Sequence, residues 1–225
     1  MNLFNNSKYG NMLTIILIVS IVAIIGIIGI IGYRIYRTYY IETGAMQAAD
    51  AFESNLNSNI SNNNQLQNNS VGGGIITNVE DTSSSTSGNT TTKYKGFTVI
   101  GTIQIPAIDI KYPILEKNTK KSLETSVVLM YTSSGINEIG NTVIIGHNYR
   151  NGTMFSNVKK LENGDYIYIT DEQGRKVKYT TYKVYQTSGS DGSYISRNTE
   201  GKREISLSTC TDDGKGRIIV LAKED

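Results

Sequence analysis

The stretch "EISLSTCTDDGKGRIIVLAK" (residues 204–223) contains two short apolar-rich runs with a polar segment between them. Runs of this kind are typical of β-strands. The segment between them contains Asp213-Gly214, a tight-turn signal, and a second glycine, Gly216. The sequence therefore predicts a β-hairpin that places Cys210, at the end of the first strand, beside Arg217 on the second.

The same kind of residue pattern extends over residues 94–225, where short runs rich in Val, Ile, Tyr and Thr alternate with Gly, Asn and Asp. The strands expected from these runs are 97–105, 108–115, 126–131, 141–147, 165–170, 176–186, 204–209 and 217–223. Eight short strands separated by turn signals predict an all-β domain, a closed barrel or a sandwich. We expect a single helical turn or two in this domain, around 154–161 and after Leu123. A change of alternation phase between Tyr179 and Tyr182 predicts a β-bulge.

The N-terminal part of the chain contains a charge-free run from Tyr9 to Tyr33. About 20 apolar residues suffice to cross a bilayer as a helix, whereas the apolar region of a cleavable signal peptide is usually about 7–15 residues long. We therefore expect residues 12–33 to be an uncleaved transmembrane anchor, preceded by a short N-terminus over 1–11. Cationic residues flank the run on both sides, so the positive-inside rule does not orient it.

Residues 34–93 connect this anchor to the β-rich domain. The first part, 34–53, is expected to extend the anchor as a short helix. The segments 54–74 and 80–92 are rich in Asn, Ser, Gly and Thr and have few apolar residues to bury. The composition predicts a flexible linker, either a tether with a defined reach or simple low-complexity chain.

Composition excludes some classes of function. The 225 residues carry a net charge of +2, with no basic stripe of the kind that binds nucleic acid. A single cysteine cannot form an intramolecular disulfide. One His and one Cys are too few soft ligands for zinc, and no calcium-loop pattern is present, although Asp and Glu leave calcium dependence open.

His147, Cys210 and Arg217 are the candidate catalytic residues. Each is expected at a strand end, and strand ends of a small barrel can converge on one rim. A thiol reacts as its thiolate, which a neighbouring imidazole or guanidinium favours, and a fixed guanidinium can stabilise an oxyanion. The pattern predicts cysteine acyl transfer. The alternative is that each residue is structural, in which case the domain is a non-catalytic, membrane-tethered β-domain that binds cell-wall or protein partners.

The N-terminal anchor, the polar tether, "GHN" (146–148), "STC" (208–210) and "RIIV" (217–220) together resemble the sortase family. The resemblance covers roughly residues 97–225, and the order His, Cys, Arg is specific to that family, since papain-like enzymes carry Cys before His. The stretch "GHNYRNGTMFSNVKKL" (146–161) is most similar to class B. The segment 187–203 departs from class B because it is too short for the long helix usual there.

The resemblance implies a closed eight-stranded barrel and a cysteine transpeptidase of the Gram-positive cell surface. Cys210 would attack the Thr carbonyl of an LPxTG-like C-terminal sorting motif, His147 would transfer protons, and Arg217 would steady the oxyanion. The acceptor would be an amine of a peptidoglycan cross-bridge or its lipid-linked precursor, with hydrolysis by water as a variant. The catalytic domain would then lie outside the cell and the N-terminus in the cytoplasm.

The resemblance also implies further site residues. Thr209 would support the nucleophile through its backbone or hydroxyl group, and the segment 187–198 corresponds in position to the loop that shapes specificity in sortases. Asp212 matches an acidic residue found two positions after the cysteine in some class B members, and is a possible accessory residue. The expected substrate-binding residues are Ser208, Thr209, Asn148, Tyr194 and Ile195; no metal or other cofactor is assigned.

Overall fold

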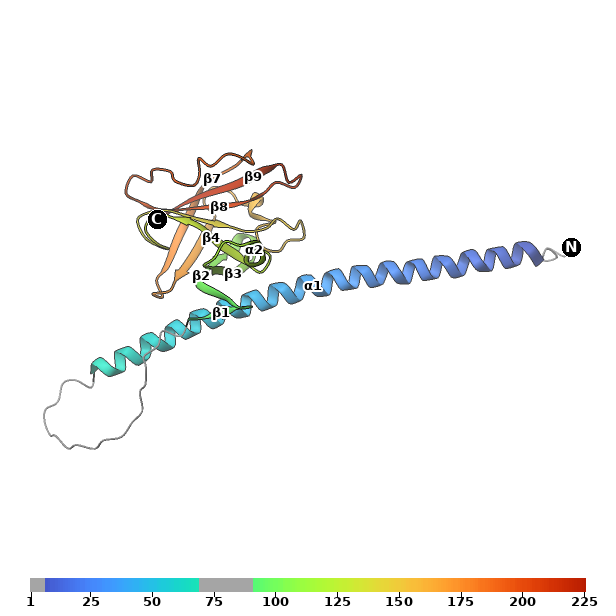
Figure 1. The fold of residues 1–225 in the computed structure, drawn as a ribbon, viewed down its shortest axis with the longest axis horizontal. Coiled ribbons are helices and arrows are strands. Elements are labelled where there is room, and N and C mark those ends of the chain that lie inside the picture. Colours follow the sequence, from blue (N-terminus) through green and yellow to red (C-terminus); the bar gives the residue numbers. More distant parts are fainter. Residues whose placement is uncertain (1–6, 69–90) are drawn as a thin grey trace, which may run out of the picture. The chain divides into compact units, whose positions relative to one another are not determined.

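The computed structural model describes residues 7–68 and 91–225, and the chain divides after Thr43 into two compact units (Figure 1). The expected N-terminus over 1–11 and the linker segment 80–92 lie largely outside the described residues. The first unit consists of the N-terminal part of helix α1 (Ser7–Asn68). The second unit contains the remainder of α1 and all of the strands.

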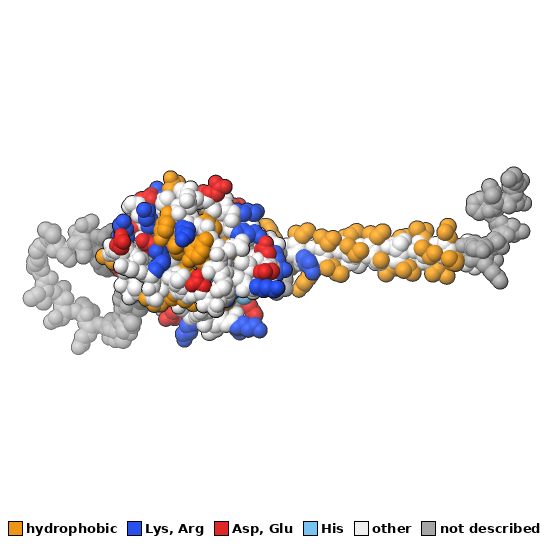
Figure 2. Space-filling view, turned by 90° about the horizontal axis from the view of Figure 1, so that it is seen from above, with side chains coloured by type: hydrophobic (Ala, Val, Ile, Leu, Met, Phe, Trp, Pro, Cys, Tyr) orange, Lys and Arg blue, Asp and Glu red, His pale blue; other side chains and the backbone are white. Residues whose placement is uncertain are grey.

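The first unit contains a helical stretch, Gly10–Tyr36, with a mean hydropathy of 3.2 and no buried residues. Figure 2 shows apolar side chains along this stretch on the face in view. With 27 residues at about 1.5 Å of rise each, it is long enough to cross a hydrocarbon core of about 30 Å. Its position agrees with the apolar run expected over 12–33.

The second unit is built on one sheet that closes on itself. Its strands are β1 (Lys93–Tyr94), β2 (Phe97–Ile105), β3 (Ile110–Leu115), β4 (Val127–Thr132), β5 (Gly140–Ile145), β6 (Tyr166–Asp171), β7 (Lys176–Ser188), β8 (Arg203–Cys210) and β9 (Gly216–Glu224). They are ordered β1-β2-β3-β4-β5-β8-β9-β7-β6, and β2 also pairs with β6. That second pairing closes β2–β9 into the eight-stranded barrel that the resemblance implied, with β1 as a two-residue addition at its edge.

The strand boundaries match the expected ones to within about two residues, and the bulge is confirmed as a register shift between Thr181 and Lys183 where β7 pairs with β9. The helical turns differ in detail. Helix α2 (Lys120–Leu123) ends at Leu123, where we expected one to begin, because Thr119 forms a capping box with Ser122 that starts the turn earlier. Within 154–161 only the 3₁₀ turn η2 (Val158–Lys160) forms, and another, η1 (Pro106–Ile108), separates β2 from β3.

The barrel interior is filled by inward-facing aliphatic side chains. Alternate residues of β2 from Val99 to Ile105 are buried, as expected for a strand with one face on the core, and Thr102, which contacts Glu53 of α1, is buried on the other face. Closure places a steric requirement on Gly101, where β2 pairs with both β3 and β6. A Cβ atom at this position would lie 2.7 Å from the carbonyl oxygen of Thr170, so the closed sheet needs a glycine here.

The C-terminal part of α1 packs on the outside of the barrel, which the sequence did not predict. Ala45, Ala49 and Phe52 are buried, and Ala45 and Phe52 belong to the main apolar core. Glu53 accepts hydrogen bonds from Thr102 of β2 and Lys111 of β3. We expected 54–74 to be flexible linker, whereas residues 54–68 continue the helix.

Candidate active site

The hairpin of β8 and β9 positions Cys210 and Arg217 as directly opposed partners, as the sequence predicted. Arg217 Nη1 donates a hydrogen bond to Cys210 Sγ at 2.8 Å. The turn between them is closed by the Thr211 N–H donating to the Gly216 carbonyl at 3.1 Å, with Gly214 at φ +74°. The guanidinium is therefore in contact with the sulfur and is placed to stabilise negative charge that develops next to it.

His147 reaches the same edge of the barrel because β5 and β8 are parallel neighbours, with Ile145 opposite Ser208. Parallel strands end at the same side of a sheet, so the residues that follow β5 lie near the end of β8. Two hydrogen bonds join these segments. Thr209 Oγ1 donates to the Gly146 carbonyl at 2.8 Å, and Asn148 Nδ2 donates to the Cys210 carbonyl at 2.9 Å.

One cavity of about 490 Å³ contains all three candidate catalytic residues in its lining. Ser208, Thr209, Tyr194 and Ile195, expected from the resemblance to contact substrate, line it as well. Gly189, Ser190, Asp191 and Gly192 of the segment 187–198, which was expected to shape specificity, also line it, as does Gly146 of "GHN". The lining residues that the sequence did not single out as part of a site are Asn118, Leu123, Met130 and Ile145. Leu123, Met130 and Ile145 come from three separate elements, and no local pattern connects them to the cysteine.

The electrostatics of the cavity favour a neutral imidazole. Burial lowers the pKa of His147 below its ordinary 6.5, and the distant negative charge of Glu124 opposes this only in part. The imidazole ring lies against Tyr149, with ring centroids 5.0 Å apart. A neutral imidazole that lines the same cavity as the Cys210 sulfur can accept a proton from a thiol or an attacking amine and then pass it to a leaving group.

Asn148 and Asp212 lie outside the lining of this cavity. Asn148 Nδ2 donates to Asp212 Oδ1 at 2.9 Å as well as to the Cys210 carbonyl, and Asp212 forms an ion pair with Lys159. Hydrogen bonds from Lys159 and Asn148 lower the pKa of the exposed Asp212 carboxyl. Asn148 therefore contacts the Cys210 backbone, Asp212 contacts the Asn148 side chain, and direct substrate contact by Asn148 is still a prediction.

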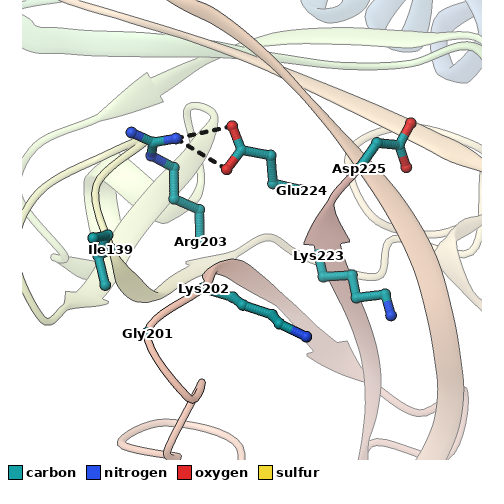
Figure 3. A pocket seen from close by; sticks show the side chains of 7 residues that line it. All are labelled: Ile139, Gly201, Lys202, Arg203, Lys223, Glu224 and Asp225. Carbon is teal, nitrogen blue, oxygen red and sulfur yellow. Dashed lines mark hydrogen bonds and ion pairs between the residues drawn. The ribbon is translucent and has the colours of Figure 1, made fainter.

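A second cavity of similar size lies elsewhere, at the opposite ends of β8 and β9. It measures about 540 Å³ and is lined by Ile139, Gly201, Lys202, Arg203, Lys223, Glu224 and Asp225, with Arg203 and Glu224 paired across it (Figure 3). It contains neither the cysteine nor the histidine, so size alone does not identify the reactive site. Among the described residues, no group of three or more His, Cys, Asp or Glu side chains is arranged to hold a metal ion.

The second unit is a small closed barrel in which the single cysteine meets Arg217 across a hairpin and the single histidine lines the same cavity. These features define the class of protein as a barrel with a thiol-containing site. The Sortase domain profile matches residues 103–225, more than half of the chain. The protein therefore belongs to the sortase family.

Individual relatives agree with this assignment. The chain is 30% identical over 125 residues to Sortase A of Bacillus anthracis, covering 54% of this chain and 58% of the relative, and 31% identical over 140 residues to Sortase SrtE1 of Streptomyces coelicolor, covering 54% and 39%. The chain thus spans roughly half the length of these curated relatives. Among solved structures, a Clostridium perfringens Sortase D5 transpeptidase superposes with a TM-score of 0.52 at 32% identity, covering 57% of this chain and 79% of that one.

A Corynebacterium diphtheriae Sortase A lid mutant superposes similarly, with a TM-score of 0.53 at 30% identity, covering 57% and 71%. The relatives carry the designations A, E1 and D5, so these matches do not point to class B. Residues 189–202 between β7 and β8 form turns and irregular chain without the helix usual in class B. This observation agrees with the sequence, in which the segment 187–203 is too short for that helix.

Proposed function

We propose that this protein is a membrane-anchored cysteine transpeptidase that cleaves an LPxTG-like sorting motif of surface proteins after its Thr and joins the acyl fragment to a peptidoglycan amine. The observation that carries the proposal is the hydrogen bond from Arg217 to Cys210 Sγ inside a cavity that His147 also lines. One related structure, a Clostridium perfringens sortase C, is described as containing the C-terminal cell wall sorting motif.

The proposed reaction has two acyl transfers. His147 takes the proton of the Cys210 thiol as the sulfur attacks the Thr carbonyl carbon, which forms a C–S bond and an oxyanion that the Arg217 guanidinium stabilises. The intermediate collapses with cleavage of the C–N bond, and His147 gives a proton to the leaving amine. An incoming amine then attacks the thioester, His147 takes its proton, and the thiolate leaves. The cavity volume of about 490 Å³ is in the range of small-ligand and peptide-segment sites.

The role of Arg217 follows from its chemistry. Its planar fork of N–H donors can bind the sulfur in the free enzyme and a developing oxyanion in the transition state. Thr209 supports the nucleophile indirectly, because its hydroxyl group is directed to the Gly146 carbonyl. A non-catalytic binding role would suit a sealed, inert thiol, whereas Cys210 is only partly buried and lines the cavity.

The test uses the full chain in detergent with a panel of fluorogenic pentapeptides that vary the residues around a central Thr-Gly bond. We expect cleavage of at least one motif, capture of the acyl fragment by an added peptidoglycan-type amine, and loss of both with Cys210→Ala. Ser196→Ala, an exposed change in the neighbouring loop, serves as the control. Retained cleavage in Cys210→Ala would refute the mechanism, and cleavage without capture by any amine would indicate a hydrolase.

A further inference from the structure

The loop 189–202 between β7 and β8 forms one side of the Cys210 cavity through Gly189–Gly192, Tyr194 and Ile195. This segment has no strand ladder of its own, because it consists of turns and irregular chain. Irregular loops are ordinarily among the more mobile parts of a domain. A defined cavity wall therefore requires side-chain contacts that fix Tyr194 and Ile195.

Asn141 of β5 supplies the central contacts from behind the loop. Its side chain is 1% exposed, and its Nδ2 donates to the carbonyls of Tyr194 at 2.9 Å and Ile195 at 2.7 Å. Its Oδ1 accepts from Arg197 Nη2 at 3.2 Å and lies 3.0 Å from Ser206 Oγ. Both amide hydrogens and both acceptor sites of the side chain are therefore in use.

Arg197 and Glu204 extend this network to β7 and β8. They form an ion pair whose side chains are 15% and 10% exposed. Arg197 also donates from Nη1 to the Tyr182 hydroxyl at 2.8 Å and from Nε to Ser206 Oγ at 3.3 Å. The Tyr182 hydroxyl in turn donates to Glu204 at 2.8 Å. Burial and the hydrogen bond to Glu204 raise the pKa of Tyr182 to about 12, so this donor remains protonated at physiological pH.

Apolar packing fixes the Tyr194 side chain as well as its carbonyl. Tyr194 is 5% exposed and packs with Val143, Ile219 and Leu221 in a cluster on the outer face of the sheet, separate from the barrel interior. Its hydroxyl lies 3.3 Å from Ser208 Oγ, and Ser208 also lines the cavity. The loop is therefore attached to the sheet at the two residues that form the apolar part of its cavity face.

Stability alone does not account for such a network. Replacing a buried ion pair by apolar side chains of similar volume is often neutral or stabilising, because desolvation offsets the Coulomb attraction. A fully satisfied polar network instead fixes one geometry, because every alternative leaves a buried group without a partner. Here the geometry that is fixed is the position of the Tyr194 and Ile195 backbone.

We propose that Asn141, Arg197 and Glu204 are positioning residues that hold Tyr194 and Ile195 as a rigid apolar wall of the substrate cavity. Leu123, Met130 and Ile145 add further apolar lining. A peptide segment with an uncharged, apolar side chain fits this wall, and a charged side chain is excluded from it. The inference rests on the proposed transpeptidase function for its substrate, but the loop geometry can be tested without any substrate.

The first experiment compares Asn141→Asp with wild type in peptide cleavage by the full chain in detergent. The change keeps the shape of the side chain but replaces the amide group that donates to the Tyr194 and Ile195 carbonyls by a carboxylate oxygen, which cannot donate. We expect KM for the cleaved peptide to rise about tenfold or more, with kcat changed less than about threefold, because the wall binds peptide without touching the reacting atoms. The preference for apolar over charged peptides should weaken, whereas alkylation of Cys210 by iodoacetamide should be unchanged.

Asn198→Ala is the matched control. Asn198 is exposed in the same loop, and its Oδ1 accepts only a local hydrogen bond from the Glu200 N–H. This variant should retain wild-type KM.

The ion pair between Arg197 and Glu204 is tested by comparing Arg197→Met, which leaves Glu204 buried without its cation, with the double variant Arg197→Met/Glu204→Leu. The single change should raise KM more than the double change.

Hydrogen exchange of the Tyr194 and Ile195 amides provides the readout that needs no peptide. Asn141→Asp should accelerate their exchange about tenfold or more relative to Asn198→Ala, because local opening becomes easier. If wild type cleaves no peptide, the proposed function fails and the exchange result still decides the positioning role. Unchanged KM and exchange in Asn141→Asp would overturn the inference, as would a fall in kcat accompanied by slower alkylation.

Discussion

Arg217 and Cys210 face each other across the β8–β9 hairpin, and the guanidinium donates a hydrogen bond to the sulfur. Arg217→Met should lower kcat/KM for peptide cleavage about 10²–10³-fold, because the developing oxyanion loses its cationic partner. Arg217→Lys should recover only part of this loss, because an ammonium lacks the planar fork of donors that binds an oxyanion.

The measurement is kcat/KM for the cleaved peptide, with the enzyme concentration counted by iodoacetamide alkylation of the one cysteine. Lys160→Met removes an exposed positive charge elsewhere and should leave kcat/KM unchanged. Wild-type kcat/KM in Arg217→Met would contradict stabilisation of the oxyanion by the guanidinium.

His147 is the only histidine of the chain, so its imidazole signals can be followed by NMR without assignment. Burial lowers its pKa, and we expect a titration midpoint below 6.5 that returns toward 6.5 in urea. Because the folded pKa is the lower one, its contribution to stability is complete above about pH 6.5 and is lost as pH falls through the folded value. A midpoint above 6.5 would contradict the burial of the ring.

Among the elements, the C-terminal part of α1 is the one whose contribution to the barrel is least evident from its sequence. Phe52 is 4% exposed and belongs to the core cluster, whereas Met46 on the same helix is 38% exposed. Phe52→Ala should lower the free energy of unfolding by about 3 kcal/mol through lost burial and a residual cavity. Met46→Ala should change it by less than about 0.5 kcal/mol. Urea denaturation in detergent measures both, and equal effects would show that the helix does not dock.

Glu53 adds a charged contact to the same docking surface. Burial raises the pKa of its carboxyl, but hydrogen bonds from Lys111 and Thr102 outweigh this, so the folded pKa lies below 4.5. The contribution of Glu53 to stability is therefore complete above about pH 4.5 and is lost as pH falls through the folded pKa. Glu53→Gln should be less stable than wild type at pH 7, and the two unfolding curves should converge toward pH 3. A constant difference across this range would exclude the ion pair as the cause.

For the whole molecule, the proposed topology places the N-terminus in the cytoplasm, a membrane span over 12–33 and the catalytic domain outside. A membrane-impermeant maleimide applied to intact cells should label Cys210, the only thiol in the chain. In a Cys210→Ala background, Asn5→Cys should be labelled only after the membrane is permeabilised. The reverse pattern would refute this orientation and, with it, a role outside the cell.

The sequence by itself determined the eight strands, the bulge in β7, the pairing of Cys210 with Arg217 and the apolar helix of membrane-spanning length. These features depend on interactions between residues close in the chain: alternation along a strand, turn residues in a hairpin and continuous apolar character along a helix. His147 and Cys210 were identifiable as candidates because the chain contains one residue of each type.

Only the tertiary structure revealed the docking of Phe52 on the barrel, the contact of Asp212 with Asn148, and the network from Asn141 to Tyr194 and Ile195. The partners in that network are 53 and 54 residues apart in the chain. Such contacts depend on which strands become neighbours when β2 pairs with β6 and on how the β7–β8 loop folds back over the sheet. The alternation of apolar and polar residues along each strand encodes neither the strand order nor the path of this loop. The same strand pattern is compatible with several strand orders, and only closure of the barrel selects one of these orders.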